Sequence, residues 1–152
     1  MKKILATMIS LLLAVTAQAQ SDLPFNVEPV TSFDEPWAIA FMPDGRMLVT
    51  EKKGNLFVLN REGQRFGVRG VPDVDYGGQG GFGDVAVHPD FDENGLIYLS
   101  YVEAGVGDTR GAAVARAVLT LGDGRGALSD VEVIWRQYPK LHGRGHYAHR
   151  IQ

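Results

Sequence analysis

Residues 143–150, Gly-Arg-Gly-His-Tyr-Ala-His-Arg, place an imidazole among glycines, an aromatic ring and arginines near the end of the 152-residue chain. Histidine has an ordinary pKa of about 6.5 and is the side chain best suited to accept a proton near neutral pH. His146 is therefore a candidate general base. Two alternatives stay open: a structural role for His146, or a metal site formed by His142, His146 and His149 that no nearby cysteine or carboxylate completes.

A second glycine-rich segment, residues 77–84, reads Gly-Gly-Gln-Gly-Gly-Phe-Gly-Asp. Glycines at this density allow a tight turn or a close approach of the backbone to a ligand. Gln79 is the one polar side chain that reaches out of this run, so it is a candidate ligand-binding residue. The alternative is a strained turn in which Gln79 is only solvated. Asp73 and Asp75, just upstream, are weaker candidates because acidic residues in turns usually accept local hydrogen bonds.

An internal repeat indicates which elements carry these loops. Residues 39–44 (Ile-Ala-Phe-Met-Pro-Asp) and 85–90 (Val-Ala-Val-His-Pro-Asp) align without a gap at an offset of 46 residues. Each copy is an apolar strand that ends in a Pro-Asp turn. A second strand follows each turn, at residues 46–51 and 96–101. The repeat therefore predicts two antiparallel hairpins.

Two further strands are expected after each hairpin, at residues 56–59 and 65–68 in the first unit and at 112–121 and 131–135 in the second. A four-stranded unit that recurs every 40 to 50 residues or so is typical of a β-propeller blade. A β-sandwich is the alternative for about eight short strands. The 46-residue offset favours the propeller. The predicted fold is all-β, with about two propeller blades in this chain.

The repeat also relates the two candidate residues to each other. His146 precedes the apolar Ile151 much as Gln79 precedes Val85. We therefore expect Gln79 and His146 to emerge from equivalent loops near the propeller axis and to share a pocket. Because Ile151 would begin a third blade, the chain is predicted to be the N-terminal part of a larger propeller. Two blades alone leave apolar faces and strand edges open, so we do not expect this chain to fold stably by itself.

The N-terminus predicts export. Residues 1–19 contain two lysines, an uncharged apolar run and small residues before a cleavage site after Ala19, which is the pattern of a secretory signal peptide. A membrane anchor is the alternative, but the run is shorter than the roughly 20 residues that a spanning helix needs. Residues 20–152 are predicted to form the mature protein, in the periplasm or secreted.

Composition narrows the classes of partner. Removal of the leader changes the formal charge from −3 to −5, because two lysines and no acidic residue leave with it. A negative chain is a poor partner for nucleic acid. The sequence contains no cysteine, so disulfides do not hold the fold. No segment after the leader is apolar enough to cross a bilayer.

Five segments taken together resemble the soluble pyrroloquinoline-quinone (PQQ)-dependent sugar dehydrogenases of the glucose/sorbosone dehydrogenase family, and most of all the aldose sugar dehydrogenase branch. They are residues 36–46 (PWAIAFMPDGR), 78–81 (GQGG), 87–91 (VHPDF), 97–101 (IYLSY) and 145–147 (GHY). The resemblance covers nearly the whole mature chain in order. It implies an exported six-bladed propeller.

The resemblance also implies a reaction, the oxidation of an aldose at its anomeric carbon to the lactone. His146 occupies the position of the histidine that removes the hydroxyl proton while hydride passes to PQQ. Gln79 is similar to the glutamine that holds both the sugar and the quinone edge of the cofactor, so it is expected to bind substrate and cofactor. Ca²⁺ is the second implied cofactor, and an external electron acceptor is the implied partner. The family's calcium ligands and other PQQ contacts lie in later blades, so this chain alone is expected to hold no metal and to be inactive.

Two positions depart from the family pattern. Gly145 stands where the glucose-oxidising branch has an aspartate, which argues against glucose-type substrate binding, and His149 stands where a small residue is usual. Since a fold does not fix a function, two alternatives to the dehydrogenase stay open. One is a non-catalytic propeller that binds a ligand or a protein, and the other is an inactive truncated remnant.

Overall fold

The computed structural model describes residues 24–122 and 125–152, and nearly all of its regular structure is β. The predicted signal peptide, residues 1–19, lies outside the described residues. The elements in chain order are β1 (Pro36–Phe41), β2 (Met47–Glu51), β3 (Asn55–Leu59), β4 (Arg65–Arg69), β5 (Phe82–Val87), α1 (Phe91–Asn94), β6 (Leu96–Ala104), β7 (Thr109–Gly122), β8 (Arg125–Arg136) and β9 (Leu141–His142).

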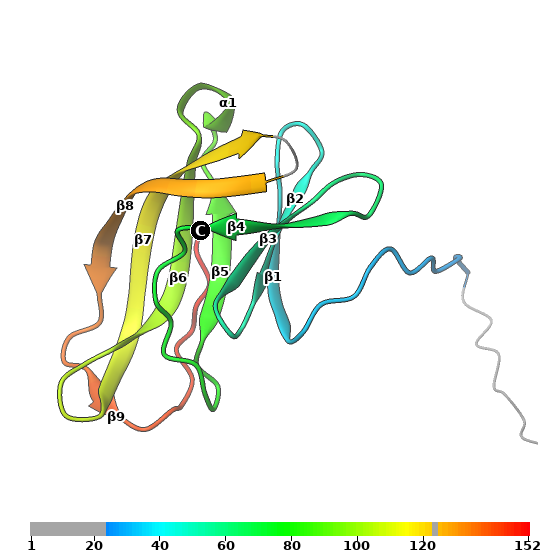
Figure 1. Ribbon diagram of the computed structural model, residues 1–152. Coiled ribbons are helices and arrows are strands. Elements are labelled where there is room, and N and C mark those ends of the chain that lie inside the picture. The colour runs from blue at the N-terminus through cyan, green and yellow to red at the C-terminus, as the bar shows by residue number, and fades with distance from the viewer. Residues whose placement is uncertain (1–23, 123–124) are drawn as a thin grey trace, which may run out of the picture.

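The strands form two four-stranded antiparallel propeller blades, β1 to β4 and β5 to β8, as the repeat predicts (Figure 1). The last strands of the two blades, β4 and β8, pair in parallel where Val68 and Arg69 lie opposite Gly126 and Ala127. This pairing joins the blades in one sheet of order β1-β2-β3-β4-β8-β7-β6-β5. On the opposite side, β5 packs against β1 and β2. The result is a nearly closed, barrel-like arrangement.

All eight predicted strands are present, and the differences lie at their ends. β7 and β8 are longer than predicted because they pair with each other through two register shifts, and β7 pairs with β6 along nine positions. The turn predicted over residues 90–95 winds into the single-turn helix α1, which Gly95 ends with a left-handed φ of 63°. The two-residue strand β9, which pairs with β7, was not predicted because so short a segment has no alternation to read.

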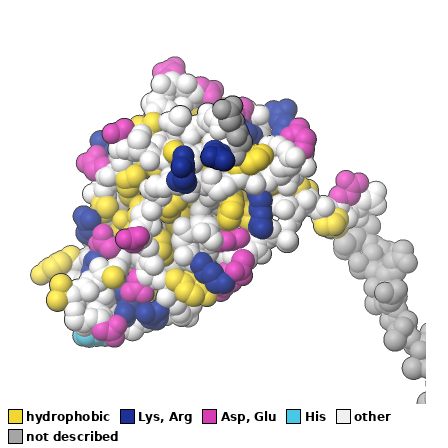
Figure 2. Space-filling view, in the orientation of Figure 1, with side chains coloured by type: hydrophobic (Ala, Val, Ile, Leu, Met, Phe, Trp, Pro, Cys, Tyr) yellow, Lys and Arg dark blue, Asp and Glu magenta, His cyan; other side chains and the backbone are white. Residues whose placement is uncertain are grey.

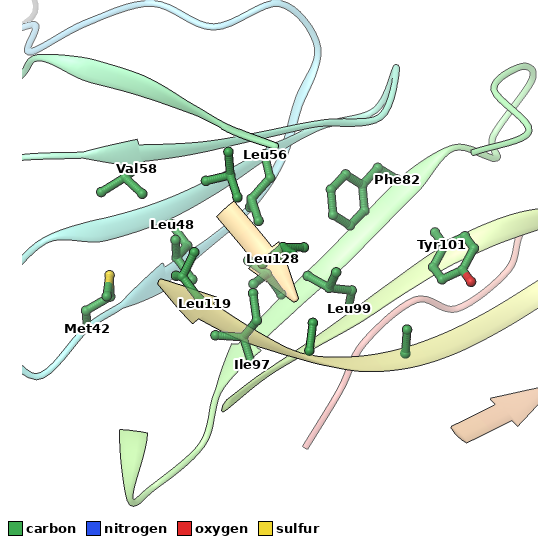
Figure 3. Packing of buried hydrophobic residues seen from close by; sticks show 14 of the residues in the cluster. Met42, Leu48, Leu56, Val58, Phe82, Ile97, Leu99, Tyr101, Leu119 and Leu128 are labelled. Atoms are coloured by element: carbon green, nitrogen blue, oxygen red, sulfur yellow. The ribbon is translucent and has the colours of Figure 1, made fainter. Parts of the chain in front are cut away.

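One hydrophobic core lies between the blades (Figure 3). Leu48 and Leu56 from the first blade meet Ile97, Leu99 and Leu119 from the second, and all five are buried. Burial of an aliphatic side chain of this size stabilises a fold by about 1.5–3 kcal/mol. The two blades are therefore one folding unit, and each covers a face that the other would otherwise expose.

The outer faces of the pair remain apolar and exposed. Trp37, Ile39 and Phe41 of β1 and Ile134 and Trp135 of β8 are all exposed. These are the open faces that the sequence predicts for two blades. Elsewhere, acidic and basic side chains are interspersed on the surface that Figure 2 shows. Within residues 24–122 and 125–152, no helix has the length and apolar character needed to cross a membrane.

Candidate functional site

The loops that carry Gln79 and His146 lie against each other at one end of the blades. We call residues 76–81 the glutamine loop and residues 143–149 the histidine loop. The Gln79 N–H donates to the Arg144 carbonyl oxygen at 3.1 Å. Gly78, with a φ of 57°, lies so close to Arg144 that a Cβ at this position would collide with its carbonyl oxygen. The glycines therefore allow the close approach that their density predicts.

His146 is exposed, and one hydrogen bond indicates which of its ring nitrogens carries the proton. The Ala148 N–H donates to His146 Nδ1 at 3.0 Å. A neutral imidazole that accepts at Nδ1 carries its proton on Nε2, so Nε2 is a donor in this arrangement. Ala148 has a φ of 50°, in the left-handed region that costs a non-glycine residue energy. The hydrogen bond that occupies the Nδ1 lone pair is thus donated by a residue with a strained backbone.

Gln79 is also exposed, so its amide is available to a ligand. Two cavities lie next to His146. The smaller, of about 170 Å³, is lined by Arg110, His142 and Tyr147, among others, and the larger, of about 530 Å³, lies along β1. Gln79 lines neither of them. The two loops are in contact, whereas a pocket shared by Gln79 and His146 stays a prediction.

His149, the departure from the family pattern, is the buried residue of the histidine loop, with 7% of its surface exposed. Its ring lies 5.8 Å from the Trp37 ring and 5.9 Å from the Tyr147 ring, centroid to centroid. It also lies over Gly83 of β5, where any Cβ would collide with the imidazole. The imidazole fits at position 149 because Gly83, its neighbour on β5, has no side chain.

Ser100 sets the protonation of His149. The Ser100 hydroxyl donates to the His149 carbonyl oxygen at 2.6 Å, so it can only accept from the ring nitrogen Nδ1, 3.4 Å away. The proton then sits on Nδ1, and Nε2 is left as a buried acceptor without a partner among the described residues. Burial lowers the pKa of His149, the nearby His146 lowers it further, and Asp84 opposes this by raising it. The imidazole is therefore held neutral.

The weaker candidates Asp73 and Asp75, and the two arginines of residues 143–150, divide into two groups. Asp75 and Arg144 lie between the two loops, with Asp75 Oδ1 3.3 Å from Arg144 Nη2. Asp73 and Arg150 are exposed, and Arg150 lines the larger cavity. The sequence did not single out Arg110, which lies beside His146 and binds Asp75. The chain carries no local signal for that ion pair, because its partners are 35 residues apart.

In the part of the chain that the structure describes, no group of three or more His, Asp or Glu side chains could hold a metal ion. The three-histidine site that spacing alone left open therefore has no support.

Comparisons with known proteins agree with this architecture. The model of the glucose/sorbosone dehydrogenase family matches residues 33–152. The chain is 40% identical over 129 residues to aldose sugar dehydrogenase YliI of Escherichia coli (strain K12), which covers 83% of this chain and 34% of that protein. It is 33% identical over 135 residues to the uncharacterized protein slr1608 of Synechocystis, which covers 82% of this chain and 31% of that protein.

Solved structures have the same fold. The crystal structure of the soluble aldose sugar dehydrogenase from Escherichia coli in the apo-form superposes with a TM-score of 0.71 at 38% identity, over 77% of this chain and 34% of that chain. The PQQ-bound aldose sugar dehydrogenase from Streptomyces coelicolor superposes with a TM-score of 0.62 at 22% identity, over 72% of this chain and 32% of that chain, which is a likeness of fold. The chain thus spans about a third of the length of these relatives. On the family match and the identity to the Escherichia coli protein, this chain belongs to the glucose/sorbosone dehydrogenase family.

Proposed function

We propose that this chain is the N-terminal portion of an exported, PQQ-dependent dehydrogenase that oxidises an aldose at its anomeric carbon to the lactone. The observation that carries the proposal is the contact between the two loops that present Gln79 and His146, both exposed at the same end of the blades. Its relative in Escherichia coli is named an aldose sugar dehydrogenase. The partners are then the sugar and an external electron acceptor.

The residues present fit one edge of PQQ, a planar ortho-quinone with three carboxylates. The His146 Nε2–H and the Gln79 amide are exposed donors that could hold quinone oxygens. When bound, PQQ supplies the hydride acceptor that amino-acid side chains lack. The described residues contain no cluster of carboxylates for Ca²⁺. We therefore assign the calcium ligands and the remaining PQQ contacts to the rest of the protein.

His146 would remove the proton from the anomeric hydroxyl. This role needs a lone pair, and the His146 lone pair lies on Nδ1, where it accepts from Ala148. Because the Ala148 backbone is strained, rotation of that peptide would relieve strain and free the Nδ1 lone pair to act as the base, while the proton on Nε2 still serves the quinone oxygen. Gly145 puts no carboxylate beside His146, and this favours aldoses other than glucose.

The test is His146→Ala in the full-length protein, supplied with PQQ and Ca²⁺ and assayed by dye reduction with a panel of aldoses. Loss of a general base is expected to lower kcat by about 10²–10⁴-fold. His88→Ala is the control, since His88 stacks on Tyr98 and lines neither of the two cavities next to His146. Full activity of His146→Ala would remove His146 from the mechanism. Absence of activity in the unchanged protein with every aldose would instead favour a binding module.

Export is tested separately. We propose that the leader is removed after Ala19 and that the protein acts in the periplasm or outside the cell. N-terminal sequencing of the protein from the periplasmic fraction should begin at Gln20. A protein recovered from the cytoplasm with Met1 intact would contradict this localisation.

A further inference from the structure

Asp75, which leads into the glutamine loop, binds two arginines from two other parts of the chain. Its Oδ2 accepts from Arg110 Nε at 2.8 Å, and its Oδ1 lies 3.3 Å from Arg144 Nη2. Arg110 comes from the start of β7, and Arg144 belongs to the histidine loop. The Asp75 side chain is 12% exposed and the Arg110 side chain 6%. A single, largely buried carboxylate thus joins the two loops and the second blade.

The pair of Asp75 and Arg110 is well satisfied, which is what a rigid connection requires. Arg110 Nη2 donates to Asp108 Oδ1 at 2.6 Å, and Arg110 Nη1 donates to the carbonyl oxygens of Asp108 and Gly143, at 3.0 and 3.3 Å. Asp75 and Asp108 both raise the pKa of Arg110, so the guanidinium keeps its charge. Hydrogen bonds between charged groups are stronger than neutral ones and have a narrow geometry. The bond to Gly143 extends the connection into the histidine loop.

The glutamine loop is attached to both blades. The Val102 N–H of β6 donates to the Gly81 carbonyl oxygen at 2.9 Å. Two side-chain contacts reach the first blade. Lys52 Nζ donates to the Gly78 carbonyl oxygen at 2.6 Å, and the Tyr76 hydroxyl donates to Glu35 Oε2 at 2.6 Å. These contacts fix the loop relative to β1 and β2 but do not reach the histidine loop.

Three polar connections join the two loops themselves. The Gln79 N–H donates to the Arg144 carbonyl oxygen, and Arg144 Nη1 donates to the Tyr76 carbonyl oxygen. The third is Asp75, which meets Arg144 and Arg110.

We propose that Asp75 is a positioning residue: through Arg110 and Arg144 it holds the glutamine loop against the histidine loop and so sets the separation of Gln79 and His146. Asp75 itself is turned toward the two arginines, so it acts through these loops. The proposal rests on the proposed function only for what Gln79 and His146 do once they are in place. The contact between the loops can be measured without catalysis.

The experiment is hydrogen exchange by mass spectrometry on the full-length apo-protein carrying Asp75→Asn, which keeps the shape and removes the charge. We expect exchange in peptides that cover residues 76–81 and 143–149 to become about tenfold faster or more, as local opening does. Exchange in residues 96–99 of β6 and 114–121 of β7, away from the contacts of Val102 and Arg110 with the loops, should stay unchanged. Glu132→Gln is the matched control, because it neutralises the exposed pair of Arg116 and Glu132 far from both loops, and it should leave both segments as they are.

A second variant keeps the test informative if Asp75→Asn does not fold. Arg144→Met removes the contacts of that side chain with Asp75 and with the Tyr76 carbonyl oxygen and leaves the pair of Asp75 and Arg110 in place. Exchange should therefore rise in the histidine loop and at the Gln79 amide alone. Faster exchange throughout the strands in both variants would show a merely structural role and overturn the proposal. Unchanged exchange in the two loops would overturn it as well.

Kinetics give a second readout. If Asp75 positions the loops, Asp75→Asn should lower kcat by roughly 10–100-fold with a smaller change in KM, because misplaced groups affect the reacting geometry more than binding. An equal effect on KM with kcat intact would contradict a positioning role. If the full-length protein oxidises no aldose, the proposed function fails, while the exchange experiment still decides whether Asp75 holds the loops together.

Discussion

The first strands of the two blades, β1 and β5, have the same sequence pattern and opposite surroundings. Ile39 of β1 and Val85 of β5 are equivalent in the repeat, yet Ile39 is 54% exposed and Val85 is 3% exposed. β5 packs on one side against β1 and β2. On the other side the C-terminal segment runs alongside it, where the Ile151 N–H donates to Asp84 Oδ2 at 2.8 Å (Figure 1).

The difference shows that the apolar side chains of a blade's first strand are buried only when an element outside its own blade packs against them. β1 has its apolar alternation, but the described residues cover it only on the side of β5. β5 has a neighbour on both sides. The alternation of apolar and polar residues is therefore set by the strand's own sequence, whereas the burial of the apolar residues depends on which elements pack against the strand.

The largest expected effect comes from removing a phenylalanine from each of these strands. Phe82→Ala on β5 should destabilise the protein by about 3–5 kcal/mol, because Phe82 is 1% exposed and its removal leaves a cavity in the core. Phe41→Ala on β1 is the matched variant, and since Phe41 is 71% exposed it should stay within about 0.5 kcal/mol. Urea denaturation of the protein measures both. A comparable loss in Phe41→Ala would show that a surface outside the described residues covers β1.

An intermediate effect is expected from the hydroxyl that ties the first blade to β5. Thr50 of β2 is fully buried, donates to the Gly83 carbonyl oxygen at 2.7 Å and accepts from the Ala38 N–H at 3.1 Å. Thr50→Val keeps the shape but leaves both backbone groups unpaired, which should cost about 1–3 kcal/mol by urea denaturation.

Thr120→Val supplies the matched control for this substitution. Thr120 is an exposed threonine of β7, so the change there should be close to neutral. Equal, small effects of the two substitutions would mean that the bond across the blades contributes little and that apolar packing alone holds β5 in place.

The repeat predicted the strands and the turns between them because local alternation and glycine placement are written in consecutive residues. It also predicted that Gln79 and His146 emerge from equivalent loops and share a pocket. The Gln79 N–H joins its loop to Arg144 of the histidine loop, whereas the shared pocket stays a prediction. It could not give the exposure of Ile39 against Val85, since identical patterns meet different neighbours.

The supporting residues of the site were beyond sequence reasoning for a related reason. Arg110 lies in a segment whose glycines predict a flexible hairpin loop, and its partner Asp75 is 35 residues away. His149 was noted as a possible metal ligand and as a departure from the family pattern, whereas the burial of its imidazole depends on the bare backbone of Gly83 beneath it. Contacts between distant residues follow from packing, which no local pattern encodes.

The smallest expected effect is a pH dependence of the stability that the segment over β5 contributes. Burial first, and then His146, lower the pKa of His149 below its ordinary 6.5. Between the two pKa values the unfolded state binds a proton more readily than the folded state, so the contribution of His149 to stability is full above pH 6.5 and is lost as the pH falls toward the folded pKa. Thermal unfolding measured from about pH 8 to about pH 6 should show a falling Tm that His149→Asn flattens.

His142→Asn, at an exposed histidine of the same region, should leave that fall in place. If the Tm of His149→Asn falls as steeply as that of the unchanged protein, the neutral imidazole over Gly83 is not what makes the cover on β5 sensitive to pH. If the fall disappears, the difference between β1 and β5 is partly electrostatic. The cover on β5 then depends on a histidine that must stay neutral, and β1 shares that dependence only where Trp37 meets the His149 ring.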